Sequence, residues 1–206
     1  TGTVAEAVVL KSDGFKVLDG GGPTGFVRSE GMIKSEWLAT ADQRLELKLG
    51  LATEDSDETY LGLSQSDFES SPYRRFAARS LGHMRWYRTQ AELEWTGRIG
   101  SDVRTRTVLY HHHLDRSWTK FNRFAGPIDT HKLLQSEPTG GQGAIYLDIL
   151  RGTENTSSPD QMLLIGTNHR IFHSFGLQNT NEWTLETDAF RSVLEFGVRL
   201  HGDHVR

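Results

Sequence analysis

The residues best suited to bind a ligand are arginines gathered in one long segment between hydrophobic runs. The motif PYRRF contains Tyr73, Arg74 and Arg75, and Arg79 follows four residues later. A guanidinium group can hold a carboxylate through two parallel hydrogen bonds, so neighbouring arginines can bind a ligand that carries several carboxylates. The sequence therefore predicts a ligand-binding group made of Tyr73, Arg74, Arg75 and Arg79.

The same arginines could instead stabilise the segment in which they lie. Carboxylates outnumber them nearby, and an ion pair with one of these would fix the loop rather than bind a ligand. The available acidic residues are Asp55, Asp57, Glu58, Asp67 and Glu69. Both interpretations remain open at the level of the sequence.

Three consecutive histidines offer a second chemistry. His111, His112 and His113 lie in a run rich in threonine and valine, which favours a strand. Consecutive strand residues point to opposite faces, so only His111 and His113 share one. Two histidines on a face can bind a transition metal, but the sequence shows no third protein ligand. We therefore expect no metal site, and a solvated or interfacial role for these side chains.

Catalytic signatures are missing from the sequence. It has no G-x-S-x-G nucleophile elbow and no cysteine. The glycines at 20–22 lack the lysine-serine ending of a phosphate loop, so we interpret them as a turn. We therefore expect no enzyme and no cofactor.

Composition limits the classes of protein further. The chain has 206 residues, 36% of them hydrophobic, and a net charge of -4. No stretch approaches the roughly 18 consecutive apolar residues that a membrane-spanning helix needs. A membrane strand is compatible with this composition, because only alternate residues face lipid. The charge balance gives no indication of nucleic-acid binding, which would favour a basic stripe.

The elements that must position these groups are strands. The run RLELKLGL at 44–51 alternates strictly, with leucines on one face and polar or small residues on the other, which is typical of a strand. Similar alternation occurs at 87–96 and 192–201. Weaker patterns predict further strands at 4–11, 26–38, 103–113 and 175–185. The expected outward, lipid-facing residues are Leu45, Leu47, Leu49, Leu93, Trp95, Leu194, Phe196, Val198 and Leu200.

The lengths of the connections indicate how the strands are arranged. Short turns at 39–43, 97–102 and 187–191 alternate with long loops at about 12–25, 53–83 and 115–168. Loops longer than about 15 residues are uncommon in compact domains, whereas outer-membrane barrels have short turns at one end and long loops at the other. We therefore expect an all-β antiparallel meander of about seven strands, part of a transmembrane β-barrel. A short helix or strand is expected at 143–151.

Several segments resemble one family of proteins. In chain order they are SDGFKVLDGGGPTGF, LELKLGLATEDSDETYLGLSQSDFESSPYRRFAAR, TRTVLYHHHLDRSWTKFNRF and EFGVRLHGDHVR. Together they cover nearly the whole chain. Together they resemble the TonB-dependent outer-membrane receptors, especially the ferric-dicitrate-like branch. The DETYLGL and PYRR stretches carry most of the specificity.

This resemblance implies a bacterial outer-membrane location and uptake of a ferric chelate, either ferric citrate or a ferric siderophore. Such receptors resemble barrels of about 22 strands closed by a plug, and the TonB complex acts on that plug. We therefore expect residues 1–206 to be a partial barrel, without the plug and the remaining strands. The expected partners are the chelate, outer-membrane lipid and, through the plug, the TonB complex.

Two alternatives remain open. A receptor of the same family could carry another nutrient, such as an oligosaccharide or cobalamin. A protein of another class, a soluble β-sandwich binding module or glycan-active enzyme, would also contain alternating strands. Asn179 and Asn181 mildly favour the soluble alternative, because they interrupt the apolar face of the strand at 175–185.

Overall fold

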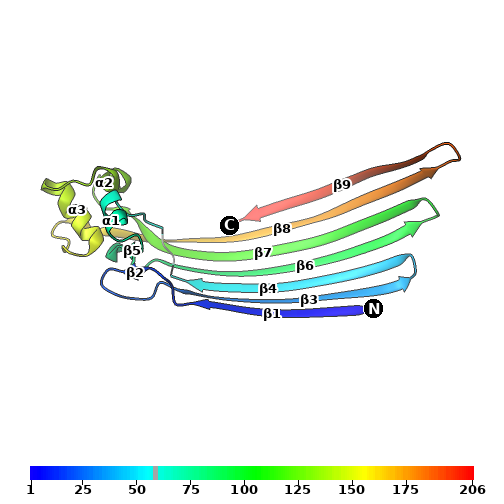
Figure 1. The fold of residues 1–206 in the computed structure, drawn as a ribbon, viewed down its shortest axis with the longest axis horizontal. Helices are drawn as coiled ribbons and strands as arrows, with labels where there is room; N and C mark the ends of the chain where they lie inside the picture. The colour runs from blue at the N-terminus through cyan, green and yellow to red at the C-terminus, as the bar shows by residue number, and fades with distance from the viewer. Residues whose placement is uncertain (58–59) are drawn as a thin grey trace.

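A computed structural model of the chain describes residues 1–57 and 60–206. It is mostly β, with 60% strand and 15% helix. The main sheet has seven strands in the order β1-β3-β4-β6-β7-β8-β9, and every neighbouring pair is antiparallel (Figure 1). The predicted antiparallel meander of seven strands is confirmed. The sheet is open, with β1 and β9 at its two edges.

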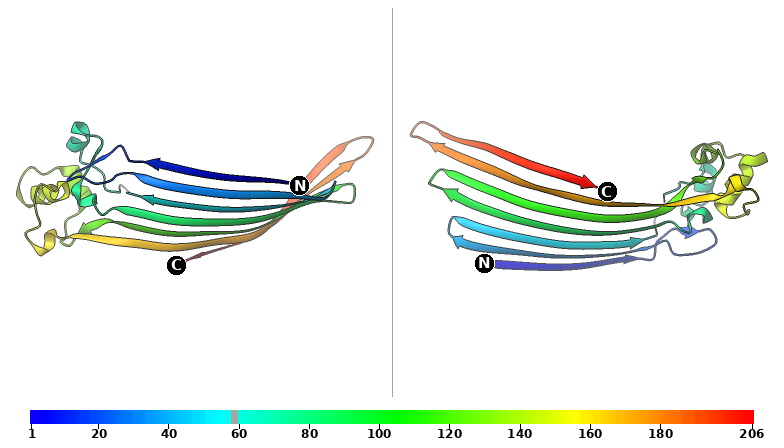
Figure 2. Two further views of the ribbon diagram at one scale, coloured as in Figure 1. Left: turned by 90° about the horizontal axis from the view of Figure 1, so that it is seen from below. Right: turned by 180° about the vertical axis from the view of Figure 1, so that it is seen from behind.

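The strands alternate with short turns at one end of the molecule and long connections at the other (Figure 1). Their bounds are β1 Gly2–Ser12, β3 Phe26–Thr40, β4 Gln43–Ser56, β6 His83–Ile99, β7 Val103–Phe124, β8 Leu163–Glu186 and β9 Arg191–Val205. Figure 2 shows the same long, gently curved sheet from two further sides.

Two strands are much longer than the sequence pattern predicts. β7 has 22 residues and β8 has 24, so the third long loop covers 125–162 rather than 115–168. The added segment of β7 carries polar residues on both faces, for example Asp115, Arg116 and Ser117. Polar residues on both faces remove the period-2 signal, and cross-strand hydrogen bonding then forms the strand without it.

One face of the sheet is apolar. Directly paired residues share a face, and one row runs from Leu47 through Leu93, Leu109 and Leu177 to Leu200. We call this side the apolar face. It carries all nine residues predicted to face outward, namely Leu45, Leu47, Leu49, Leu93, Trp95, Leu194, Phe196, Val198 and Leu200. Eight of them are exposed and Leu47 is half-buried.

The opposite side, which we call the charged face, carries the alternate residues. Lys34 lies opposite Lys48, which lies opposite Glu92. Glu46 pairs with Glu94 in the next row towards the turns. The two faces therefore differ strongly in polarity along the middle of the sheet, as a two-sided antiparallel sheet requires.

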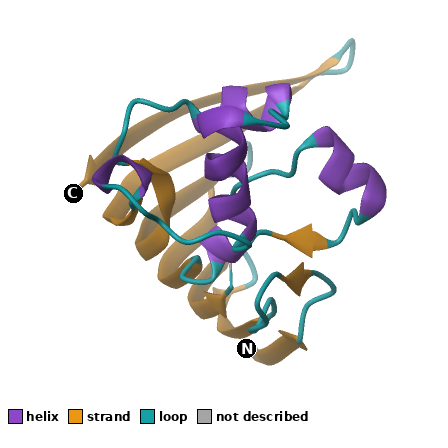
Figure 3. Ribbon diagram, turned by 90° about the vertical axis from the view of Figure 1, so that its left-hand side faces the viewer, coloured by secondary structure: helices purple, strands orange, loops and turns teal. Residues whose placement is uncertain are grey.

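The long connections fold together into a small cap at one end of the sheet (Figure 3). The helices of the cap are α1 Gln65–Ser70, α2 Thr130–Ser136 and α3 Gly141–Arg151, with single turns η1 Ala77–Arg79 and η2 Pro159–Gln161. A parallel pair joins β2 Val17–Leu18 to β5 Arg74–Arg75. The segment predicted as a helix or strand at 143–151 is therefore a helix.

Side-chain caps explain where two of these helices begin. Ser64 accepts a hydrogen bond from the backbone of Asp67 at the start of α1, and Asp129 accepts two at the start of α2. Gly152 ends α3 in a left-handed conformation. Within the described ranges, no helix is long and apolar enough to cross a membrane.

The buried apolar core of the molecule lies in the cap, not on the sheet. It joins the end of β7 to the loop helices, and Phe124 and Leu150 at its centre are fully buried. Its members are Phe76, Ala78, Phe121, Phe124, Leu133, Leu134, Tyr146, Leu147, Ile149 and Leu150. This core holds the second and third long connections against the end of β7, and the β2–β5 pair joins the first connection to the second.

Candidate ligand-binding site

Arg74, one of the predicted binding residues, belongs to an ionic cluster within the cap. Arg74 donates from Nε to both carboxylate oxygens of Asp19, at 3.0 and 2.8 Å, and from Nη1 to Asp67. Arg151 of α3 donates to the same Asp67 from Nη2 at 2.8 Å and from Nε at 3.1 Å. Ser64 also donates to this carboxylate. Asp67 thus ties three segments of the cap together.

The environment of Asp67 favours its ionised form. Burial acts in the opposite direction, because it penalises a charge, but hydrogen bonds from Arg151 and Ser64 and the charges of Arg151 and Arg74 outweigh it. The pKa of the Asp67 carboxyl is therefore lowered from its ordinary value. The pKa of Arg151 is raised despite burial, since Asp67 and Asp148 stabilise its cation. Asp67 and Arg151 are therefore both charged at neutral pH.

The other predicted binding residues lie in different environments. Arg75 and Arg79 are only 2% and 1% exposed, so their guanidinium groups lie inside the cap. Tyr73 is 59% exposed and its ring stands edge-on to Phe15, with centroids 5.7 Å apart. The four predicted residues do come together at the cap, but only Tyr73 and part of Arg74 face solvent.

Of the acidic residues proposed as alternative partners of these arginines, some lie beside them and others lie elsewhere. Asp67 pairs with Arg74, as the structural interpretation predicts. Asp55 and Asp57 lie near His83 instead, at 3.3 and 3.7 Å. Glu69 accepts a hydrogen bond from Gln65, and Glu58 lies outside the described residues.

The charged face carries a second group of polar side chains. Arg44 reaches Glu36 at 3.3 Å and Glu94 at 3.2 Å, and Arg106 reaches Glu94 at 2.6 Å. Lys34 pairs with Glu46 at 2.9 Å in the same region. These contacts form an ion-pair network across β3, β4, β6 and β7, in which neighbouring charges largely neutralise one another.

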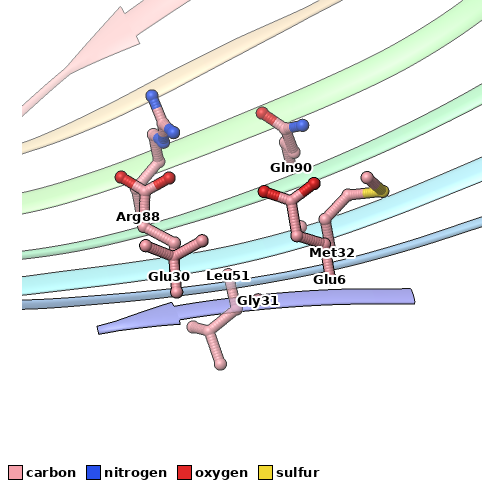
Figure 4. A pocket seen from close by; sticks show the side chains of 9 residues that line it. Glu6, Glu30, Gly31, Met32, Leu51, Arg88 and Gln90 are labelled. Carbon is pink, nitrogen blue, oxygen red and sulfur yellow. The ribbon is translucent and has the colours of Figure 1, made fainter. Parts of the chain in front are cut away.

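A hollow of about 180 Å³ lies on this face beyond the network. Figure 4 shows Glu6, Glu30, Arg88 and Gln90 around it, with Leu51 pointing to the opposite side of the sheet. Gly50 opens the floor, because a Cβ there would lie 2.7 Å from the Gln90 side chain. Such a surface can hydrogen-bond a polar solute but presents charges of both signs.

The three histidines divide as strand geometry predicts. His112 lies on the charged face, with Nε2 3.2 Å from Glu92. His111 and His113 lie on the apolar face, where His173 of β8 joins them. Within the part of the chain that the structure describes, no group of three or more His, Cys, Asp or Glu could hold a metal ion.

Sequence reasoning missed several of these contacts. Asp19 and Arg151 complete the cluster around Arg74 and Asp67 from segments far away in the chain. Lys120 places Nζ 3.5 Å from the ring centroid of Tyr60, near Trp118. No local pattern links these residues, so only the tertiary structure brings them together.

No protein-family model matches the chain, and no curated protein matches it significantly.

Proposed function

We propose that this chain is a segment of a TonB-dependent receptor in the bacterial outer membrane that takes up a ferric chelate. The observation that carries the proposal is the single seven-stranded sheet with one exposed apolar face and one charged face. Its short turns lie at one end and its folded long loops at the other. This combination is the organisation of outer-membrane barrels.

Strand length supports the proposal. A strand needs about 9–11 residues to cross the bilayer at a tilt of about 45°. The shortest of the seven strands, β1, has 11 residues, and β9 has 15. The extra residues of β7 and β8 extend beyond that span and carry the cap, which on this proposal faces the outside of the cell.

A membrane location also requires the sheet to close. Unpaired backbone groups at the edges of β1 and β9 would each cost several kcal/mol in hydrocarbon. In the proposed receptor, further strands of the parent protein pair with both edges and complete a barrel. The charged face then lines the lumen, and the apolar face contacts lipid.

The resemblance and the cap support the proposed ligand. Ferric citrate and ferric siderophores carry oxygen-rich, anionic ligands that guanidinium groups bind well. Arg74, with 24% of its side chain exposed, is the arginine in the predicted group that such a ligand can reach. Arg75 and Arg79 support the loop from inside, and Tyr73 offers an exposed ring beside Arg74. The TonB complex acts through a plug in the parent protein.

The soluble alternative has one observation in its favour. Asn179 and Asn181 lie on the apolar face, which a lipid environment disfavours. Their side chains are hydrogen-bonded within the sheet: Asn181 donates to Asn179 at 2.5 Å, and Asn179 donates to Thr107 at 2.9 Å. This polar group would sit easily in a soluble β-sandwich or glycan-active enzyme, and the experiment below separates the two functions.

Membrane contact can be tested by placing single cysteines, because the chain has none of its own. Spin labels at Leu47, Leu49 and Leu93 should be reached by a lipid-soluble relaxation agent when a parent receptor without other cysteines is isolated in membranes. Labels at Lys48 and Glu92 should respond to a water-soluble agent instead. Water accessibility at all five positions would reject the membrane proposal.

Chelate binding needs a separate test on the parent receptor. We expect Arg74→Ala to weaken ferric-citrate binding and uptake at matched surface levels, since one charge-assisted contact is lost. Arg98→Ala, at the turn end of the sheet, is the matched control and should leave both unchanged. Equal uptake by wild type and Arg74→Ala would remove Arg74 from the site.

A further inference from the structure

Four imidazoles meet on the apolar face, across three neighbouring strands. In the register, His113 of β7 lies opposite His173 of β8, which lies opposite His204 of β9. His111 is one row nearer the turns on the same face. The rings of His111 and His173 stack with centroids 5.5 Å apart, and those of His113 and His173 are 4.8 Å apart.

One pair of nitrogens in this group has a distinctive spacing. Nε2 of His111 lies 3.3 Å from Nδ1 of His173. Zinc binds imidazole nitrogen at about 2.0–2.1 Å, so two nitrogens on one tetrahedral ion lie about 3.3–3.4 Å apart. The distance between these two nitrogens therefore matches that between two ligands of a single tetrahedral ion.

The chemistry of the pair restricts the ion. Neutral imidazole suits zinc, copper and nickel, whereas hard cations such as magnesium and calcium prefer oxygen. Each ring can ligate through the named nitrogen while its hydrogen sits on the other one. A divalent transition-metal ion then displaces the hydrogen bond between the two rings.

We propose that His111 and His173 form a binding site for one divalent transition-metal ion. The site has two protein ligands, and water fills the remaining positions, in agreement with the absence of a three-residue group among the described residues. It lies on the face opposite the charged hollow and does not depend on the proposed transport of a ferric chelate.

The position of the pair gives the ion access to water. One row further towards the cap, His169 pairs with Asp115 at 2.7 Å, and Arg85 pairs with Asp55 at 3.2 Å beyond it. The apolar face therefore becomes polar one row beyond His113 and His173, whereas Leu49 and Phe175 still share the row of His111. An aquated ion can reach the pair from this side.

Titration of the whole chain in detergent micelles with copper(II) chloride tests the proposal. We expect one equivalent to bind, with electron paramagnetic resonance showing coupling to two imidazole nitrogens. His111→Asn and His173→Asn should each weaken binding at least about tenfold, the smallest loss expected when even an outer-shell partner of a metal is removed. His112→Asn, which changes the adjacent residue on the charged face, and His131→Asn in α2 should bind as wild type does.

Two outcomes would overturn the assignment. Unchanged affinity in the double variant His111→Asn/His173→Asn would show that copper binds elsewhere. A wild-type spectrum with coupling to fewer than two imidazoles would reject the paired site even where a variant fails to fold, because that measurement needs no substitution.

Discussion

Arg151 of α3 and Asp67 of α1 are 84 residues apart in the chain, and Nη2 of the arginine lies 2.8 Å from Oδ2 of the aspartate. The same carboxylate also accepts from Arg74, whose other partner is Asp19. The cap is therefore held by an apolar core and by one carboxylate shared between two arginines. Loss of this carboxylate should affect all three long connections together.

We predict that Asp67→Asn loosens the cap while leaving the sheet intact. The neutral amide of this variant cannot neutralise Arg74 and Arg151, and leaving buried donors without a good partner costs about 1–3 kcal/mol. Hydrogen exchange should accelerate in α1 and α3 but not in β3 or β4. Glu69→Gln, in the same helix but exposed, serves as the control. Equal protection of α1 and α3 in both variants would contradict a structural role for the cluster.

The pH dependence of the cap follows from the same residue. The folded-state pKa of Asp67 is below its ordinary value of 3.8, so the folded state binds its proton less readily than the unfolded chain does. The stabilisation is complete above that ordinary value and disappears as the pH falls towards the lowered folded-state pKa. Protection of α3 should decline over this acidic range in wild type and show a weaker pH dependence in Asp67→Asn.

The sequence predicts the sheet better than the cap, for physical reasons. Leu45, Leu47 and Leu49 reveal their strand because one face differs in polarity from the other, and this signal needs no knowledge of the partner strand. The extension of β7 through Asp115 to Phe124 has no such contrast. Its pairing with β8 becomes visible only when both strands are in place.

The candidate site shows the same limit. The motif around Arg74 is visible in the sequence, and so is the possibility that Asp67 neutralises it. Asp19 and Arg151 come from other loops, and no spacing rule connects them to Arg74. Likewise, strand parity predicts that His111 and His113 share a face, but His173 is found only through the register of β7 with β8.

Arginine substitutions on the two faces of the sheet should have different effects. We predict that Leu93→Arg hinders membrane insertion, since an arginine facing lipid near the midplane costs about 2–4 kcal/mol. Glu92→Arg changes the neighbouring residue on the charged face and should have a smaller effect. The measurement is the folded fraction of the parent receptor recovered in vesicles across a urea series. Equal losses in the two variants would argue against a lipid-facing apolar face.

The last prediction concerns Gly176, where β8 comes close to its neighbours. A Cβ there would lie 2.5 Å from both the carbonyl oxygen of Leu200 and the hydroxyl of Tyr110, which contacts Nδ1 of His201 at 2.6 Å. Because the backbone of β9 cannot move aside easily, Gly176→Ala should destabilise the sheet by about 1–3 kcal/mol, as overpacking does.

A matched glycine provides the control. A Cβ at Gly31 meets nothing within 4 Å, so Gly31→Ala should be neutral or slightly stabilising through loss of chain entropy in the unfolded state. Denaturant midpoints of both variants in the same detergent give the comparison. If Gly176→Ala matched Gly31→Ala, the close approach of β9 to Gly176 would be wrong, and with it the register that places Tyr110 beside His201.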